Sequence, residues 1–303
     1  MRSTILMVRP VSFGFNEQTA GSNAFQVRTV EQLDVQQKAL VEFDAFVDKL
    51  QTNGIDVIVI DDTPQPHTPD SIFPNNWVSF HEDGKVFLYP MQAKNRRLER
   101  RADVIDLLKQ QFNISEVDDL SHFEQQSRFL EGTGSMVLDR QNKIAYACLS
   151  PRTDIEVMNA FCEKSGYSPV YFHSVDGNGT AIYHTNVLMC IGGKFVVICL
   201  DTVRDKQEKA ALRDMFKQTG KELIEITLSQ MNAFAGNMLE LVNDKGEHLL
   251  VMSARAYQAL TQVQIEKLQA YCRLVYSDLT VIENNGGGSA RCMMAEICLP
   301  HIN

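Results

Sequence analysis

A cysteine closes a glycine-rich run near the C-terminal end of the sequence. The run covers residues 284–292 and reads NNGGGSARC, so three successive glycines come shortly before Cys292. Glycines leave backbone N–H groups unshielded beside the thiol, which suits covalent chemistry at a thiolate. A glycine hinge next to a buried cysteine would have the same local sequence. Other polar residues of the chain decide between these two interpretations.

Four more polar residues share a feature with Cys292, because each stands just before the first strand of a predicted hairpin. They are Asn76, Glu131, His184 and Asn237. A histidine can activate a thiol, and a carboxylate can orient that histidine or accept N–H groups of a substrate. Taken singly, the asparagines fit turns or caps, the glutamate a solvated loop and the histidine a hydrogen-bonded position. Together, at matching places in a repeated fold, they predict covalent cysteine catalysis at a planar carbon that bears nitrogen.

The elements that must position these residues repeat along the chain. Four segments have the pattern strand, tight turn, strand, amphipathic helix and strand, with turns about fifty residues apart. The first turn is the pair Asp83-Gly84, which is a strong hairpin signal between β-rich runs. The four hairpins are expected at 77–91, 136–149, 187–200 and 238–252. Their helices are expected at 96–112, from Asp154, at 205–219 and at 258–272, and their last strands near 114–117 and at 168–172, 222–226 and 278–282.

The two ends of the chain supply a fifth unit. Residues 293–299 and 4–9 pair as its hairpin strands, and a helix over 33–52 and a strand over 55–60 follow. Joining the two ends in one unit closes a circular array without an unpaired terminal blade. The sequence therefore predicts a single α/β domain over residues 1–303, a five-bladed pseudosymmetric barrel or propeller in which the N- and C-terminal strands close one blade.

The composition limits the partners and the compartment. Of 303 residues, 44% are hydrophobic and 22% are charged, and the net charge of −9 comes without a basic stripe, so nucleic acid is not expected as a partner. No apolar run is long enough for a signal peptide or a membrane span. The seven cysteines show no CxxC pair and no metal-ligand spacing. This predicts a cytoplasmic protein without a bound metal.

The motifs resemble those of the guanidino-group-modifying enzymes, the superfamily of arginine deiminase, dimethylarginine dimethylaminohydrolase and the amidinotransferases. They are Glu-Gly-x-Gly at Glu131, His-x-Asn from His184 to Asn186, and the terminal GGGSARC, and the resemblance covers essentially the whole chain. It implies the five-bladed propeller known as the pentein fold, and no metal or organic cofactor. It further implies that Cys292 is the nucleophile, His184 the general acid and base, and Glu131 the carboxylate that holds substrate and histidine.

The resemblance also implies substrate-binding residues. Arg152, in the segment SPRT, corresponds to an arginine that holds the α-carboxylate of the substrate, although a surface arginine before a helix cap fits equally well. Arg96, in RRLE, would be a second carboxylate clamp or part of a charged helix start. Asn16, in FGFNEQ, would belong to a lid or amino-acid-binding loop. Three further asparagines complete the expected set: Asn76, Asn186 and Asn237.

Two asparagines distinguish this chain from the arginine-acting members. Asn76 stands where many of them have aspartate, and Asn186 stands where several have His-x-Asp. Carboxylates suit a cationic guanidinium, whereas an amide also offers donors to the carbonyl oxygen of a neutral ureido group. The segments FGFNEQTA and FPNNW likewise resemble citrulline-utilisation hydrolases, or citrulline ureidases. The implied reaction converts citrulline to ornithine, ammonia and carbon dioxide through a carbamoyl-cysteine, with the opposite order of leaving groups left open.

Two alternatives remain at the level of the sequence. An arginine or dimethylarginine deiminase or dimethylaminohydrolase would keep the fold and change the substrate. A catalytically silent propeller would be a binding protein, like the ribosome anti-association factors that share the fold, but it would have no need of Cys292, His184 and Glu131 together. The expected partner is a small amino acid, and the sequence leaves a homo-oligomer open.

Overall fold

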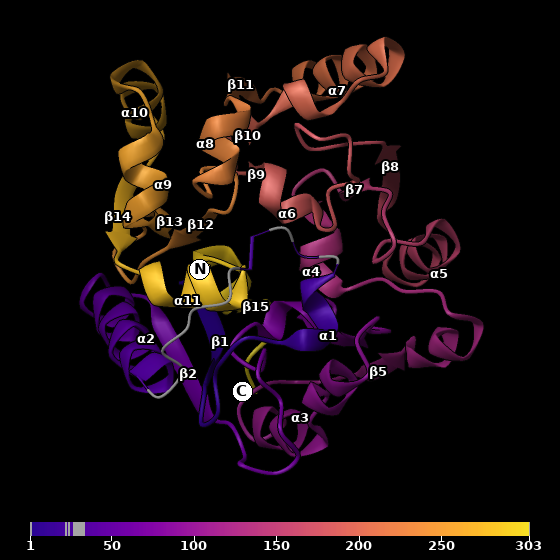
Figure 1. Ribbon diagram of the computed structural model, residues 1–303, viewed down its shortest axis with the longest axis vertical. Helices are drawn as coiled ribbons and strands as arrows, with labels where there is room; N and C mark the ends of the chain where they lie inside the picture. Colours follow the sequence, from indigo (N-terminus) through magenta and orange to yellow (C-terminus); the bar gives the residue numbers. More distant parts are fainter. Residues whose placement is uncertain (1, 22, 24, 27–33, 303) are drawn as a thin grey trace.

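Five small sheets surround a common centre in the computed structural model, and each sheet has three strands (Figure 1). The structure describes residues 2–21, 23, 25–26 and 34–302. The sheets are formed by β3 (Val78–Phe80), β4 (Lys85–Leu88) and β5 (Glu116–Asp119); β6 (Val137–Asp139), β7 (Ile144–Cys148) and β8 (Ser168–Phe172); β9 (Met189–Ile191), β10 (Phe195–Ile198) and β11 (Glu222–Glu225); β12 (Leu239–Val242), β13 (His248–Ser253) and β14 (Arg273–Ser277); and β15 (Ala295–Ile297), β1 (Thr4–Arg9) and β2 (Asp56–Asp61).

All five sheets have the same topology. The middle strand pairs antiparallel with the strand before it and parallel with the strand after it. A parallel pair needs a long crossover, and helices supply it in every unit. These helices are α2 (Val35–Thr52), α3 (Ala102–Leu108), α5 (Ile155–Ser165), α7 (Lys206–Gln218), and α9 (Ala254–Ala259) with α10 (Gln262–Gln269). The predicted five-bladed α/β propeller is confirmed.

The two ends of the chain meet in one sheet. β15 lies antiparallel to β1, with Thr4 opposite Ile297, and β1 lies parallel to β2. The helix of this unit, α2, buries Ala39, Phe43, Phe46 and Leu50 in the same apolar core as strand β1. Its residues at intervals of three and four form one apolar face, as an amphipathic helix requires. The predicted helix start at residue 33 lies outside the described residues.

Helix ends follow local sequence signals. The Asp154 carboxylate accepts hydrogen bonds from the backbone N–H groups of Glu156 and Val157 at the start of α5, and Gly166 ends that helix with a φ of +74°. Thr261 and Gln264 form a capping box at the start of α10. Because this cap begins a new helix, the single helix predicted over 258–272 is two helices in the structure.

The strand predicted over 278–282 is wrong. The third strand of that unit is β14, and residues 280–286 form helix α11 (Thr280–Gly286) instead. The Glu42 carboxylate of α2 accepts the backbone N–H groups of Val281 and Ile282, with the shortest contact at 2.8 Å to Val281. A residue distant in sequence thus satisfies the first turn of a helix that local β-propensity disfavours.

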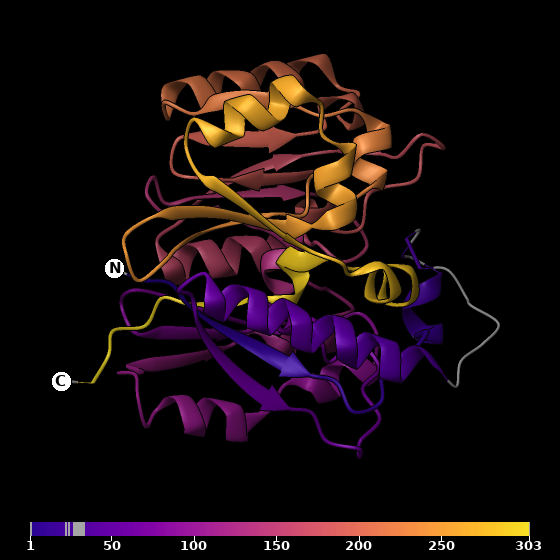
Figure 2. The same cartoon turned by 90° about the vertical axis from the view of Figure 1, so that its left-hand side faces the viewer.

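Short helices cluster where the first strands of the sheets begin. They include η2 (Pro74–Asn76), α4 (Gly132–Ser135), α6 (Thr185–Leu188) and η6 (Ala290–Met293), while others are α1 (Glu17–Ala20), η3 (Asn95–Glu99), η4 (Ser121–Gln126), η5 (Leu200–Thr202) and α8 (Leu228–Asn232). In the side view, both chain ends lie on one side of the molecule, and α1 and α11 lie on the other (Figure 2). Within the described parts of the chain, no helix has the length and apolar character needed to cross a bilayer.

Candidate active site

The predicted site residues come from five different units, but not from equivalent positions. Asn76 and Asn237 stand two residues before β3 and β12, and Cys292 stands three residues before β15. Glu131 and His184 stand farther back, directly before helices α4 and α6. The expectation of one shared register is therefore wrong for these two residues, because a turn of helix separates each of them from its strand.

In the units of Glu131 and His184, Ser135 and Asn186 lie closer to the first strand. Asn186, which was expected to bind substrate, lies within α6. Ser135 lies at the end of α4, where its hydroxyl accepts the backbone N–H of Glu131 at 2.9 Å and donates to the carbonyl of Arg152 at 2.7 Å. The α4 turn thus holds the backbones of Glu131 and Arg152 together.

Glu131 and His184 form a buried pair. The Nε2 atom of His184 lies 2.8 Å from Oε2 of Glu131, and neither side chain is more than 3% exposed. The other carboxylate oxygen accepts the backbone N–H of Gln92 at 3.0 Å. A carboxylate only accepts hydrogen bonds, so Nε2 of His184 must carry the proton and Nδ1 keeps its lone pair.

Burial keeps the imidazole of this pair neutral at physiological pH. Burial lowers the pKa of His184 to about 4, although the hydrogen bond and charge of Glu131 act to raise it. Burial acts to raise the pKa of Glu131, but the Arg152 guanidinium and the His184 hydrogen bond outweigh it, and the pKa falls well below its usual value. The site therefore holds a charged carboxylate behind a neutral base.

Gly134 lets Asn76 and His184 approach each other. A Cβ atom at this position would lie 2.4 Å from Nδ2 of Asn76 and 2.8 Å from Nδ1 of His184. Real side chains do not tolerate such distances, so a residue with a side chain here would push the amide or the imidazole away. The second glycine of the Glu-Gly-x-Gly motif thus allows the Asn76 amide and the His184 imidazole to lie close together.

Arg96 fixes the orientation of Asn76. Its Nη1 atom donates to Oδ1 of Asn76 at 2.8 Å, and its Nε and Nη2 atoms donate to the Glu99 carboxylate at 2.9 Å. A guanidinium has donors only, so the amide oxygen must face Arg96 and the NH₂ group must point away. Nδ2 of Asn76 is buried and has no hydrogen-bond partner among the described residues.

Arg96 has several partners besides Asn76. Its side chain is buried, and its donors bind Glu99, Asn76 and the backbone carbonyls of Asp70 and Phe73. A substrate carboxylate would have to displace those partners. Arg96 therefore orients Asn76 in this structure, and its role as a second carboxylate clamp stays a prediction.

Two amides face the sulfur of Cys292. Nδ2 of Asn186 and Nδ2 of Asn237 each lie 3.3 Å from Sγ. The Asn237 amide is oriented by the backbone N–H of Arg291, which donates to its Oδ1 at 3.0 Å. In the described part of the chain, no hydrogen bond joins the sulfur to His184. The thiol and the imidazole thus have different hydrogen-bond partners: the sulfur contacts Asn186 and Asn237, and the imidazole contacts Glu131.

Arg152 is not a surface residue. It is 2% exposed, its Nη1 lies 3.4 Å from Oε2 of Glu131, and its guanidinium lies 4.9 Å from the ring centroid of Tyr183. Its Nη2 also donates to the carbonyl of Thr19 at 3.2 Å, which links it to α1. The alternative of an exposed arginine before a helix cap is therefore wrong.

Asn16 contacts Asp70, a carboxylate that the sequence analysis did not identify. Its Nδ2 donates to Oδ2 of Asp70 at 2.7 Å, while its Oδ1 caps α1 by accepting the backbone N–H of Gln18. Burial raises the pKa of Asp70, whose Oδ2 lies 3.7 Å from Nε of Arg96. Oδ1 of Asp70 has no partner in the ranges that the structure describes. No recognisable motif surrounds Asp70, so only its burial beside charged residues marks it.

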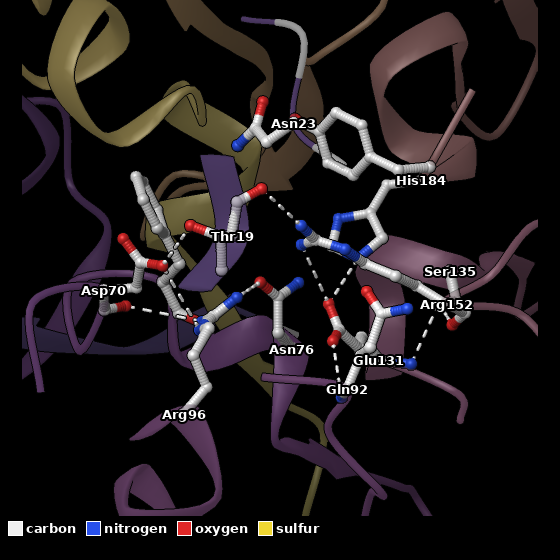
Figure 3. A network of polar contacts seen from close by, with 12 residues as sticks. Thr19, Asn23, Asp70, Asn76, Gln92, Arg96, Glu131, Ser135, Arg152 and His184 are labelled. Atoms are coloured by element: carbon white, nitrogen blue, oxygen red, sulfur yellow. Dashed lines mark hydrogen bonds and ion pairs between the residues drawn. The ribbon is translucent and has the colours of Figure 1, made fainter. Parts of the chain in front are cut away.

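Figure 3 shows how these groups divide. Asp70, Arg96 and Asn76 lie on one side, and Glu131, Arg152 and His184 lie on the other, with Thr19 between Asp70 and Arg152. The remaining cysteines lie in strands, in helices or beside them. Burial raises the pKa of each of their thiols; they are Cys148, Cys162, Cys190, Cys199, Cys272 and Cys298.

The chain matches a family model over most of its length. The sequence model described as N,N dimethylarginine dimethylhydrolase, eukaryotic, matches residues 9–299. The sequence matches no curated protein.

Solved structures share the fold at low sequence identity. The N-terminal domain of ArgZ bound to product, from an arginine dihydrolase of the ornithine-ammonia cycle in cyanobacteria, has a TM-score of 0.78 at 16% identity over 99% of both chains. DDAH from Pseudomonas aeruginosa, as a cysteine-to-serine mutant in complex with citrulline, has a TM-score of 0.67 at 18% identity over 98% of this chain and 100% of that one.

Unliganded AgrE has a TM-score of 0.74 at 16% identity over 100% of this chain. The chain spans only 41% of the ArgZ chain in its apo structure and 40% of AgrE.

Proposed function

The chain belongs to the N,N dimethylarginine dimethylhydrolase family of pentein-fold enzymes, and on that premise we propose that it is a cysteine-dependent hydrolase of the ureido group of citrulline. Cys292 is the nucleophile, His184 the acid and base, and Glu131 holds the imidazole. Arg152 binds the α-carboxylate, and Asn16 with Asp70 lies at the amino-acid end of the substrate.

The amide of Asn76 carries this proposal. Its NH₂ group is buried and has no partner among the residues that the structure describes, and Arg96 prevents the amide from turning its oxygen toward the site. An unsatisfied buried donor costs about 1–3 kcal/mol, which a carbonyl oxygen at this point would recover. Citrulline offers that oxygen, whereas a guanidinium offers only N–H donors.

The first half of the reaction transfers a carbamoyl group to sulfur. The Cys292 proton passes to Nδ1 of His184, and the thiolate, which Asn186 and Asn237 stabilise by donation, attacks the ureido carbon. Asn76 binds the oxygen as it gains negative charge. The C–N bond to the ornithine side chain then breaks, and His184 returns its proton to the leaving amine.

The second half hydrolyses the carbamoyl-cysteine. Nδ1 of His184 takes a proton from water, and the hydroxide attacks the carbonyl carbon. The C–S bond then breaks, and His184 gives its proton to the leaving sulfur, which restores the Cys292 thiol and the neutral imidazole. The released carbamate decays to ammonia and carbon dioxide. Glu131 supports both halves, because its charge stabilises the imidazolium that forms in each of them.

The family match favours a second candidate, hydrolysis of arginine or dimethylarginine. Oδ1 of Asp70, which has no partner in the described part of the chain, is an acceptor that a guanidinium N–H group could use. Against this candidate, the positions beside the imidazole and the sulfur are held by Asn76, Asn186 and Asn237, which bring no negative charge.

A product assay separates the candidates. Purified protein is incubated in parallel with citrulline, arginine and dimethylarginine, and ornithine, citrulline and ammonia are quantified. Ornithine from citrulline supports the proposal. Citrulline formed from arginine or dimethylarginine, with no turnover of citrulline, contradicts it and identifies the second candidate.

The variant Asn76→Asp tests the donor directly. A carboxylate at this position still accepts from Arg96 but cannot donate to a carbonyl oxygen, so citrulline turnover should fall by roughly 10- to 100-fold, in line with one lost hydrogen bond to a developing charge. The same change at Asn113, which is exposed, is the matched control and should have no effect. Undiminished citrulline turnover in Asn76→Asp would remove the role assigned to Asn76.

A further inference from the structure

The loop that carries Cys292 has little stiffness of its own. Helix α11 ends at Gly286, and Gly287, with a φ of +66°, closes it by donating its backbone N–H to the carbonyl of Glu283 at 2.9 Å. Because glycine has no side chain, the backbone of three successive glycines can adopt many conformations. Contacts with other residues must therefore fix the conformation of this segment. The position of the sulfur therefore depends on what holds the residues around the glycines.

A buried carboxylate ties the two ends of this loop together. The hydroxyl of Ser289 donates to Oε1 of Glu283 at 2.6 Å, and the two residues are 0% and 1% exposed. The carbonyl of Ser289 in turn accepts the backbone N–H of Cys292 at 3.0 Å. Glu283 is thus two hydrogen bonds away from the backbone of the nucleophile.

The same carboxylate is anchored to the neighbouring unit. Nε of Arg255, in α9, lies 3.0 Å from Oε2 of Glu283, and Nη2 of Arg255 donates to Oδ1 of Asn284 at 2.9 Å. The Arg255 guanidinium lies 5.9 Å from the ring centroid of Phe234. The β12–β14 unit therefore holds α11 through one ion pair and one hydrogen bond.

Side chains from two other segments hold the glycines between these points. The Tyr183 hydroxyl donates to the carbonyl of Gly287 at 2.8 Å, and Nδ2 of Asn23 donates to the carbonyl of Gly286 at 3.2 Å. These contacts are single hydrogen bonds to backbone carbonyls. Glu283 differs from them, because it joins the helix, the serine and the neighbouring unit at one point.

We propose that Glu283 is a positioning residue for Cys292, acting through Ser289 and held in place by Arg255. It has no contact with the reacting atoms. Its carboxylate keeps Sγ in reach of the amides of Asn186 and Asn237, which lie 3.3 Å from the sulfur. The inference rests on the proposed function in one respect only, which is that Cys292 is the nucleophile.

The test compares Glu283→Ala with Glu283→Gln. A misplacement of the nucleophile by about 1 Å can lower turnover by about 100-fold, so Glu283→Ala should lose about that factor in kcat while KM for the substrate stays within about twofold. Glutamine keeps an oxygen for Ser289 and should retain most of kcat. Full kcat in folded Glu283→Ala would overturn the proposal.

A second readout does not depend on which substrate is turned over. The rate at which iodoacetamide alkylates Cys292, followed by mass spectrometry of its peptide, should change in Glu283→Ala and return toward the wild-type rate in Glu283→Gln. If wild type makes no ornithine from citrulline, the proposed function fails while this measurement still tests Glu283. An alkylation rate equal to wild type in folded Glu283→Ala would overturn the inference.

The control must separate positioning from stability. Asp139, whose carboxylate is as buried as that of Glu283, forms an ion pair with Lys221 at 3.2 Å between two other units of the propeller. Asp139→Ala should lower the melting temperature comparably, with kcat and the alkylation rate unchanged in the folded protein. If both variants lose activity only in proportion to the unfolded fraction, Glu283 has a structural role alone and the proposal is wrong.

Discussion

The partners of His184 and those of Cys292 differ in charge. Around His184 the partners are ionic, because Glu131 carries a negative charge and Arg152 balances it from 3.4 Å. Around Cys292 the partners are the neutral amides of Asn186 and Asn237. The ionic side prepares a base by fixing its tautomer, and the amide side offers donors to sulfur without adding charge. The side chains that contact the sulfur thus carry no charge, which agrees with the neutral substrate that we propose.

The largest loss of kcat is expected when the carboxylate of Glu131 is replaced by a neutral amide. In Glu131→Gln, the new amide can donate to Nε2 of His184, which moves the ring proton to Nδ1 and removes the base. A tautomer error of this kind costs about 10³- to 10⁴-fold in kcat. Steady-state kinetics with the substrate measure it, and Glu247→Gln, at an exposed ion pair with Arg273, is the control. A loss below tenfold would mean that Glu131 does not set the tautomer.

A smaller effect is expected on the amide side. Asn237→Ala removes one donor to sulfur and leaves the backbone N–H of Arg291 without its acceptor. One hydrogen bond to a charged group is worth about 1.5–3 kcal/mol, so kcat/KM should fall by roughly 10- to 100-fold. Asn237→Asp restores the acceptor and puts a negative charge beside the sulfur, so it should be worse than alanine. Equal activity in the two variants would contradict the donor role.

The smallest effect concerns pH in the wild-type enzyme. The pKa of His184 lies at about 4, below its usual value, so the base stays neutral as the pH falls from 7 to 5 and becomes protonated only as the pH approaches 4. The value of kcat/KM should therefore change by less than about twofold between pH 7 and pH 5 through this group. A pH–rate profile measures it. A half-point near pH 6.5 would show that burial does not control the imidazole.

The repeated fold was open to prediction because its signals are local. Hairpin turns such as Asp83-Gly84 and helix caps such as Asp154 act through neighbouring residues, and the same pattern recurs in each unit. The error at 278–282 arose where a distant residue intervened, because Glu42 of α2 caps the first turn of α11. A local pattern cannot report a hydrogen bond from a residue 239 positions away.

The site shows the same division. Motifs identified Cys292, His184 and Glu131 as candidates, since glycines and polar residues before strands are visible in any sequence. The partners that orient Asn76 were not visible, because Arg96 and Glu99 form an ordinary charged segment until burial pairs them. Asp70 was missed for the same reason.

By itself, the sequence determined the five repeated units and the types of side chain available at their ends, because turn, cap and strand preferences are properties of short segments. The tertiary structure alone decided which nitrogen of His184 bonds to Glu131, which way the Asn76 amide faces and which carboxylate bonds to Ser289 in the loop of Cys292. These outcomes depend on donors and acceptors that meet only after folding has removed them from water, where an unmatched partner is costly.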